Sequence, residues 1–342
     1  MIYRSRAPLR IGLAGGGTDV SPYSDEFGGA ILNVTISHYA HAVIEPLSKG
    51  GIVLNAMDRK ESEHHESLND KLPVNGKLDL LKGVINRIEK DFGITEKNFC
   101  LTTYVDAPAG SGLGTSSTLM VAIIGAFAEM LKLPLGEYDI AHYAYEIERK
   151  DLQLAGGKQD QYAATFGGVN FMEFYAGDKV IVNPLRIRSK YLYELENNLV
   201  LYFTSTSRES ASIIKEQQKN VLQKNEKSIE AMHQLKEQAR MMKEALLRGQ
   251  LDEIGEILDF GFQQKRIMAH NISNNLIEEI YDAAKKSGAT GGKISGAGGG
   301  GFMTFYCPLN TRYKVMETLS SFGGQIKPYQ FTKQGLTTWT TQ

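Results

Sequence analysis

The sequence contains only two cysteines, Cys100 and Cys307, and no run of eighteen or more apolar residues. Two cysteines without knuckle spacing build neither a metal site nor a disulfide framework, so we expect buried thiols in a reducing compartment. The missing apolar run excludes a transmembrane helix. Residues 1–6 also lack the apolar core of a signal peptide, which favours a cytoplasmic location.

A surplus of charge of one sign is missing as well. The formal net charge is −1 at pH 7, and the sequence pI is about 6.7. Such a balanced chain has no basic field for a nucleic-acid backbone or a membrane surface, so we expect neither as a partner. The length of 342 residues suits about two domains. The residue pattern changes near residue 195, which favours a division into 1–195 and 196–342.

Strand and helix patterns alternate along the chain. Alternating or β-branched runs predict strands, and i, i+3, i+4 apolar spacing predicts helices. The polar stretch 58–76 is expected to be a solvated loop. The predicted strands cover 2–13, 31–46, 99–105, 169–175, 180–182, 199–203, 302–306 and 327–331. The predicted helices cover 78–92, 119–133, 140–149, 210–247, 251–269, 275–286 and 313–321.

Glycine is abundant, with 35 residues, and it is clustered. The central loop, residues 108–118, has the sequence PAGSGLGTSST and lies between a predicted strand and a predicted helix. Its glycines let the backbone approach a ligand closely, and its hydroxyl residues stand where the helix would begin. A helix N-terminus offers free N–H groups and a positive dipole end, so this pattern favours phosphate binding. A glycine turn with a Ser/Thr cap and no ligand remains the alternative.

Two common nucleotide motifs do not fit the central loop. No lysine follows its last glycine, as a Walker A motif requires. A dinucleotide fingerprint belongs in the first strand–helix unit, with an acidic residue about 20 positions further on. That spacing falls inside the next predicted helix.

Three other clusters contain polar residues. The N-terminal loop, residues 14–19, ends in Thr18 and Asp19, which could grip a small polar ligand or form an Asx-capped turn. In the stretch 156–168, Lys158 lies two residues before Asp160. Its positive charge would keep the Asp160 carboxylate ionised, as a general base requires. A surface ion pair between the two residues is the alternative. The C-terminal loop, residues 291–301, joins a helix to a strand and indicates close backbone approach.

Taken together, the order and spacing of these clusters resemble the GHMP family of small-molecule kinases. The matching motifs are residues 7–19, the central loop and residues 293–301. The resemblance implies an α+β, two-domain fold, with an N-terminal domain of the ribosomal protein S5 domain 2 type and a ferredoxin-like C-terminal domain. The active site would lie in the cleft between them. The central loop departs from the family pattern at Ser117 and Thr118, where alanines are usual.

The resemblance also implies roles for single residues. Asp160 would take or orient the proton of the acceptor hydroxyl, and Arg10 would pair with Asp160 and the γ-phosphate of ATP. Ser116 and Glu148 would hold Mg²⁺, although Glu148 by itself resembles a solvated charge at a helix end. The ATP phosphates would contact Gly110, Ser111, Gly112, Leu113, Gly114, Thr115, Ser116 and Ser117. The acceptor would contact Gly16, Gly17, Thr18, Asp19, Lys158, Gly298 and Gly299.

Within the family, residues 14–19, 156–163 and the C-terminal loop resemble sugar 1-kinases that act on D-glycero-D-manno-heptose 7-phosphate. This implies phosphoryl transfer from ATP to the C1 hydroxyl of a sugar phosphate, in nucleotide-heptose synthesis for surface glycans. A fucokinase- or galactokinase-type enzyme, and a degenerate sugar and ATP sensor, remain alternatives. Oligomeric state is left open, with a homodimer among the options. The candidate cations for a 7-phosphate are Lys158, Arg208 and Arg266.

Overall fold

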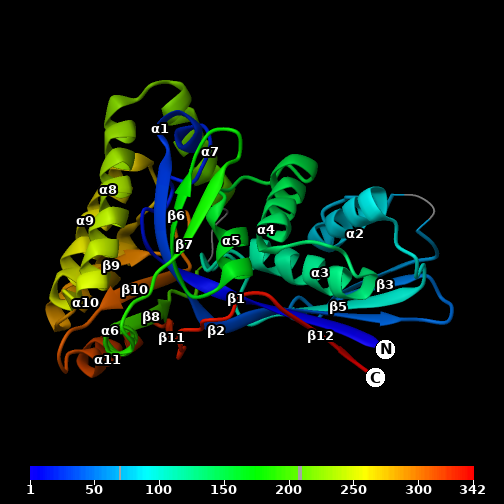
Figure 1. Ribbon diagram of the computed structural model, residues 1–342. Helices are drawn as coiled ribbons and strands as arrows, with labels where there is room; N and C mark the ends of the chain where they lie inside the picture. Colours follow the sequence, from blue (N-terminus) through cyan, green and yellow to red (C-terminus); the bar gives the residue numbers. More distant parts are fainter. Residues whose placement is uncertain (69–70, 207–209) are drawn as a thin grey trace.

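The computed structural model describes residues 1–68, 71–206 and 210–342, and within these ranges the strands form two sheets (Figure 1). The first sheet holds eight of the described strands, in the order β12-β1-β2-β5-β3-β4, with β6 and β7 added beside β2. These strands are β1 (Ile2–Ala14), β2 (Gly29–Pro46), β3 (Ile52–Ala56), β4 (Glu61–His65), β5 (Phe99–Val105), β6 (Val169–Phe174), β7 (Val180–Pro184) and β12 (Thr337–Thr341).

Strands β1 and β2 are the spine of the first sheet. They pair antiparallel from Tyr3↔Ile44 to Ala14↔Leu32, with register shifts on either side of Arg10. The end of β2 pairs with β5, and its beginning pairs with β6. Strand β3 runs parallel to β5, whereas the other recorded pairs in this sheet are antiparallel. Both spine strands are largely buried, because the helices of this half pack against them.

Helix α3 (Thr115–Leu131) packs against β1 and β2, directly after the central loop. Its run from Leu119 to Phe127 is buried on every side, as a helix that is apolar all round should be. It therefore fixes the position of the central loop against the sheet. The other helices of this half are α1 (Tyr23–Phe27), α2 (Asp79–Phe92), α4 (Glu137–Glu146), a π-helical turn (Ile147–Asp151) and α5 (Gln159–Phe166).

The second sheet is antiparallel, in the order β11-β8-β10-β9. Helices α8 and α9 pack side by side, and α9 covers β9 and β10 (Figure 1). The strands of this second sheet are β8 (Leu199–Phe203), β9 (Gly291–Ile294), β10 (Phe302–Tyr306) and β11 (Gln325–Ile326). The helices of this half are α6 (Ser189–Asn198), α7 (Ser210–Leu222), α8 (Glu226–Arg248), a 3₁₀ turn (Leu251–Glu253), α9 (Ile254–Met268), α10 (Asn275–Ser287) and α11 (Arg312–Ser320).

The end of the chain returns to the first sheet. Strand β12 pairs with β1 from Ile2↔Thr341 to Arg6↔Thr337, so the two termini lie together (Figure 1). Leu336, just before β12, lies so close to Gly125 of α3 that a Cβ there would come within 2.7 Å of it. The division of the chain near residue 195 stays a prediction, and the last residues of its second part belong to the first sheet.

Three local predictions differ from the structure. The expected loop 58–76 contains strand β4, because an edge strand can pair through its backbone without an apolar face. The expected helix 210–247 is two helices, separated where Lys224 takes a positive φ and Asn225 caps α8. Residues 327–331 form one isolated bridge to β2 instead of a strand.

No helix in the described part of the chain combines the length and the apolar character needed to cross a membrane.

Candidate active site

The central loop has the backbone shape of an anion-binding turn. Gly110, Gly112 and Gly114 have φ values of 72°, 86° and 81°, which side-chain-bearing residues rarely adopt. Gly114 is the N-cap of α3, so no side chain caps the N–H groups of the first turn. Those N–H groups and the helix dipole can receive a phosphate. Thr115, Ser116 and Ser117 follow and line the cleft, whereas Ser111 and Leu113 are fully buried beneath the turn.

The C-terminal loop lies directly on the central loop. A Cβ at Gly112 would come within 2.8 Å of the Ser295 carbonyl carbon, and a Cβ at Gly296 would come within 2.7 Å of the Gly112 Cα. The Phe302 N–H donates to the Ser111 carbonyl oxygen at 2.9 Å. Glycine is therefore required for the second half of the chain to close on the phosphate-binding turn. We call the space between the two halves the main cleft.

An ion pair joins β1 to α5 at the centre of the main cleft. Arg10 is buried, and its Nε and Nη2 both contact Oδ1 of Asp160, at 2.7 and 2.5 Å. Arg10 Nη1 donates to the Gly112 carbonyl oxygen at 2.6 Å, and the backbone N–H of Arg10 donates to the Leu113 carbonyl oxygen. Among the described residues, none donates a hydrogen bond to Oδ2 of Asp160. This oxygen is therefore left to accept a hydrogen bond from a hydroxyl group in the cleft.

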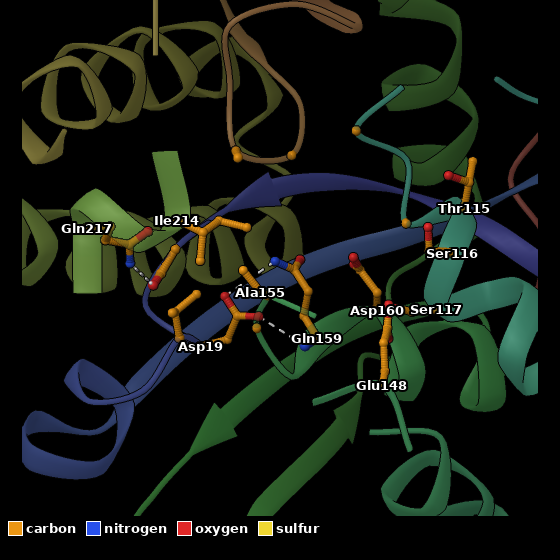
Figure 2. A pocket seen from close by; sticks show the side chains of 18 of the residues that line it. Asp19, Thr115, Ser116, Ser117, Glu148, Ala155, Gln159, Asp160, Ile214 and Gln217 are labelled. Carbon is orange, nitrogen blue, oxygen red and sulfur yellow. Dashed lines mark hydrogen bonds between the residues drawn. The ribbon is translucent and has the colours of Figure 1, made fainter. Parts of the chain in front are cut away.

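Asp19 is buried at the start of α5, close to Gln159 (Figure 2). Its Oδ2 accepts hydrogen bonds from the backbone N–H groups of Lys158 and Gln159, at 2.9 and 3.0 Å. Burial raises the pKa of the Asp19 carboxyl, and the neighbouring charge of Asp160 adds to this shift. Asp19 thus fixes the start of the helix that carries Asp160, and it also lines the main cleft.

Glu148 lies buried beneath the start of α3. Its Oε2 accepts hydrogen bonds from the Ser117 hydroxyl at 2.6 Å and from the Gln161 amide at 2.7 Å. Arg149 Nη1 lies 3.4 Å from its other oxygen, Oε1. Ser116 is adjacent in sequence and lines the same cleft (Figure 2). Ser117, which stands where the family pattern has alanine, therefore supplies a hydrogen-bond donor that orients Glu148.

The structure places several expected acceptor residues away from the main cleft. The Thr18 hydroxyl is buried and donates to backbone carbonyl oxygens of Gly15 and Ala30. Gly298 and Gly299 pack against Ile272, and the Gly299 N–H donates to its carbonyl oxygen. The main cleft is lined by Gly17 but not by Gly16. Thr18, Gly298 and Gly299 therefore hold the shape of their loops through backbone contacts, whereas Gly17 lines the main cleft.

The candidate phosphate-binding cations also lie elsewhere. Lys158 Nζ faces Asp25 and Asp178, at 3.0 and 3.4 Å, so Arg10 rather than Lys158 pairs with Asp160. The reason is helical geometry, because residues two apart at a helix start point in different directions. Arg266 stacks on Phe262 and pairs with Glu278. Arg208 lies outside the described residues.

Two buried lysines from the second half were not predicted. Lys265 of α9 lines the main cleft and donates to the Gly296 carbonyl oxygen. Burial, with repulsion from Arg10, lowers its pKa to about 8. Lys293 of β9 donates to the Gly12 carbonyl oxygen at 2.7 Å, and burial places its pKa well below the usual value. The local pattern around Lys265 carries no signal for this role, because its partners are Gly296 of the C-terminal loop and the charges of Arg10 and Asp19 in the first half of the chain.

Gln217 of α7 was also missed. Its amide donates to the Gly17 carbonyl oxygen at 2.6 Å (Figure 2). Together with Ile214 and Met268 it lines the main cleft, as Asp19 and Gln159 do. Helix α7 therefore closes the side of the cleft that is remote from Ser116 and Glu148.

The sequence matches two family models, described as GHMP kinases N terminal domain, over residues 79–168, and GHMP kinases C terminal, over residues 242–325. A curated relative from Campylobacter jejuni, D-glycero-alpha-D-manno-heptose 7-phosphate kinase, is 48% identical over 336 residues, which cover 98% of each chain. The chain belongs to the GHMP kinases. The predicted family and two-domain fold are thereby confirmed, and the chain is a kinase whose phosphoryl donor is ATP.

Solved structures of this family agree with that assignment. A structure from Bacteroides thetaiotaomicron, described as a D-glycero-D-manno-heptose 1-phosphate kinase, has a TM-score of 0.85 and 45% identity, covering 99% of each chain. A Lactococcus lactis galactokinase has a TM-score of 0.77 at 17% identity, covering 98% of this chain and 95% of its own, which shows a shared fold alone.

Replacing Gly114 with alanine is expected to impair phosphoryl transfer. A Cβ at Gly114 would lie 3.0 Å from Cγ of Asp160, so the carboxylate must move. We expect kcat to fall about 10- to 100-fold, as misplacement of a reacting group does. The matched control is Gly93→Ala, because Gly93 has a similar φ of 72° and no atom within 4 Å of its Cβ position. Equal kcat values for the two variants would contradict this expectation.

Lys265 is expected to make ATP use depend on pH. With its pKa lowered to about 8, Lys265 is charged below pH 8 and neutral above it, and an anion binds the charged form. We therefore expect kcat/KM for ATP to decline between pH 7 and pH 9. Lys265→Arg should remove this decline, because arginine stays charged throughout. The same decline in both proteins would assign the titration to another group.

Proposed function

We propose that this kinase transfers the γ-phosphoryl group of ATP to the C1 hydroxyl of D-glycero-D-manno-heptose 7-phosphate, giving the 1,7-bisphosphate. The observation that carries the proposal is 48% identity over 98% of both chains to the Campylobacter jejuni enzyme named for this acceptor. The product would supply nucleotide-activated heptose for surface glycans.

The geometry of the main cleft supports this reaction. The acceptor hydroxyl would donate a hydrogen bond to Oδ2 of Asp160, whose other oxygen is held by Arg10. As the hydroxyl oxygen forms its bond to the γ-phosphorus, the bond to the β-phosphate oxygen breaks, and Asp160 takes or orients the hydroxyl proton. Arg10 lies where its guanidinium can also contact the transferred phosphoryl group. Asp19 and Gly17 line the same cleft and would border the sugar ring.

The residues at the start of α3 suit a magnesium ion bound together with ATP. Mg²⁺ in kinases takes one or two protein oxygen ligands and completes its shell with phosphates and water. Within the described ranges no three acidic, histidine or cysteine residues gather into a metal cage, but Glu148 and Ser116 offer a carboxylate and a hydroxyl beside the anion-binding turn. The ion would neutralise charge on the β- and γ-phosphates. The Ser117 and Gln161 donors occupy Oε2, so Oε1 of Glu148, which lies 3.4 Å from Arg149 Nη1, is the oxygen that would take this role.

The named relatives also point to the alternatives. A Bacteroides fragilis protein named L-fucokinase/L-fucose-1-P guanylyltransferase is 28% identical, over 87% of this chain and 34% of that protein. In addition, the two similar heptose kinases are named for different acceptors, a 7-phosphate and a 1-phosphate. The position of the new phosphate therefore has to be measured.

A substrate panel tests the proposal. With ATP and Mg²⁺, we expect strong turnover of D-glycero-D-manno-heptose 7-phosphate and much weaker turnover of unphosphorylated heptose, fucose and galactose. NMR of the product should show a new phosphate at C1. Preferred turnover of fucose or galactose would contradict the proposed acceptor but leave the assignment to the GHMP kinases unchanged. Binding of ATP and sugar without any turnover would favour a sensor.

A further inference from the structure

A second cavity, here called the side cavity, adjoins the main cleft. It encloses about 260 Å³ and shares Asp19, Arg149 and residues 155–156 with the lining of the main cleft. Its lining does not include Arg10, Asp160 or Ser116. The side cavity therefore continues the main cleft from its acceptor end, away from the phosphate-binding turn. The transfer reaction described above gives it no role.

Most of the charged residues that line the side cavity are cations. Two of its cations already have partners. Lys158 Nζ lies between Asp25 and Asp178, and the Arg149 guanidinium donates to carbonyl oxygens of the loop 154–157. The charged residues of the wall are Asp19, Arg149, Lys158 and Lys215.

Lys215 is the cation of this wall without a partner. It lies on α7, its side chain is exposed, and among the described residues no acidic group pairs with it. The neighbouring Gln218, one helical turn further on, lines the same cavity. Its amide donates to the Ser21 carbonyl oxygen at 3.0 Å and has a second N–H. A free ammonium and a fixed amide thus face one small cavity.

Helix α7 divides its residues between the two cavities. Ile214 and Gln217 line the main cleft, whereas Lys215 and Gln218 line the side cavity. The carboxylate of Asp19 stands on the shared wall, and its Oδ2 already accepts two backbone hydrogen bonds. A ligand that reacts at Asp160 and passes Asp19 therefore meets Lys215 at its far end.

We propose that the side cavity binds the terminal phosphate of the acceptor, with Lys215 as its cationic ligand and Gln218 as an amide donor. This inference rests on the proposed function, because it takes the acceptor to be a sugar phosphorylated at the end remote from the anomeric carbon. In a heptose 7-phosphate, C1 and C7 lie at opposite ends of the molecule. The C1 hydroxyl at Asp160 thus directs the 7-phosphate away from the phosphates of ATP and towards Lys215.

Two of the cations expected from the sequence, Lys158 and Arg266, are already paired, and the third, Arg208, lies outside the described residues. Lys158 borders the side cavity but is neutralised by two carboxylates, and Arg266 is held by Glu278. Arg149 also contacts Glu148, so its replacement would disturb the reaction itself. Lys215 alone can be changed without touching a residue of the transfer reaction.

The test compares two acceptors that differ only in the terminal phosphate. Lys215→Met should lower kcat/KM for heptose 7-phosphate about 10- to 100-fold, the value of a hydrogen bond to a charged group. The same variant should leave kcat/KM for unphosphorylated heptose unchanged. Lys215→Arg should keep most of the activity with the 7-phosphate. The matched control is Lys219→Met, an exposed lysine on the same helix that lines neither cavity.

The outcomes distinguish this inference from the proposed function. If wild-type enzyme prefers the 7-phosphate but Lys215→Met keeps that preference, the assignment of the side cavity is wrong and the proposed function stands. An equal loss on both acceptors would show that Lys215 only supports the fold, which also overturns the assignment. If the wild-type enzyme shows no preference for the phosphorylated sugar, the proposed function fails, and this inference fails with it.

Discussion

The guanidinium of Arg10 is the point at which the parts of the site meet. One side of it holds Oδ1 of Asp160, and Nη1 holds the carbonyl oxygen of Gly112. It thus ties strand β1 to helix α5 and to the central loop, three segments that are far apart in the sequence. Because the pair is mostly buried, removing one partner would leave a charge without compensation, at a cost of about 3–5 kcal/mol. Both the geometry of the central loop and the orientation of the Asp160 carboxylate therefore depend on the Arg10 guanidinium.

Buried positive charge from both halves of the chain surrounds this pair. Arg10 comes from the first sheet, whereas Lys265 and Lys293 come from the second half and donate to the carbonyl oxygens of Gly296 and Gly12. Burial and mutual repulsion lower the pKa values of both lysines, which means that the protein holds their charged forms at a cost. An entering phosphate relieves that cost. The closing of the C-terminal loop on the central loop therefore supplies the cleft with charge as well as shape.

The sequence predicted the backbone of the site better than its side chains. Phosphate-binding turns require glycine at fixed positions for steric reasons, so the central and C-terminal loops were visible as local patterns. Contacts such as Lys265 with Gly296, or Gln217 with Gly17, depend on the packing of distant segments and leave no local signal. Lys158 shows the opposite error, because a residue close to Asp160 in sequence points to Asp25 instead. Strand β12 was missed for a related reason, since its partner β1 lies at the other end of the chain.

The most direct test of this account is the activity of Asp160→Asn, measured together with binding. Asparagine keeps an oxygen for Arg10 but cannot accept the hydroxyl proton. The account predicts that kcat falls at least about 100-fold, the usual contribution of a general base. Calorimetry should meanwhile show nearly unchanged affinity for ATP and for heptose 7-phosphate. Wild-type kcat in this variant would contradict the central role of the Arg10–Asp160 pair, and so would a loss of binding that accounts for the whole loss of rate.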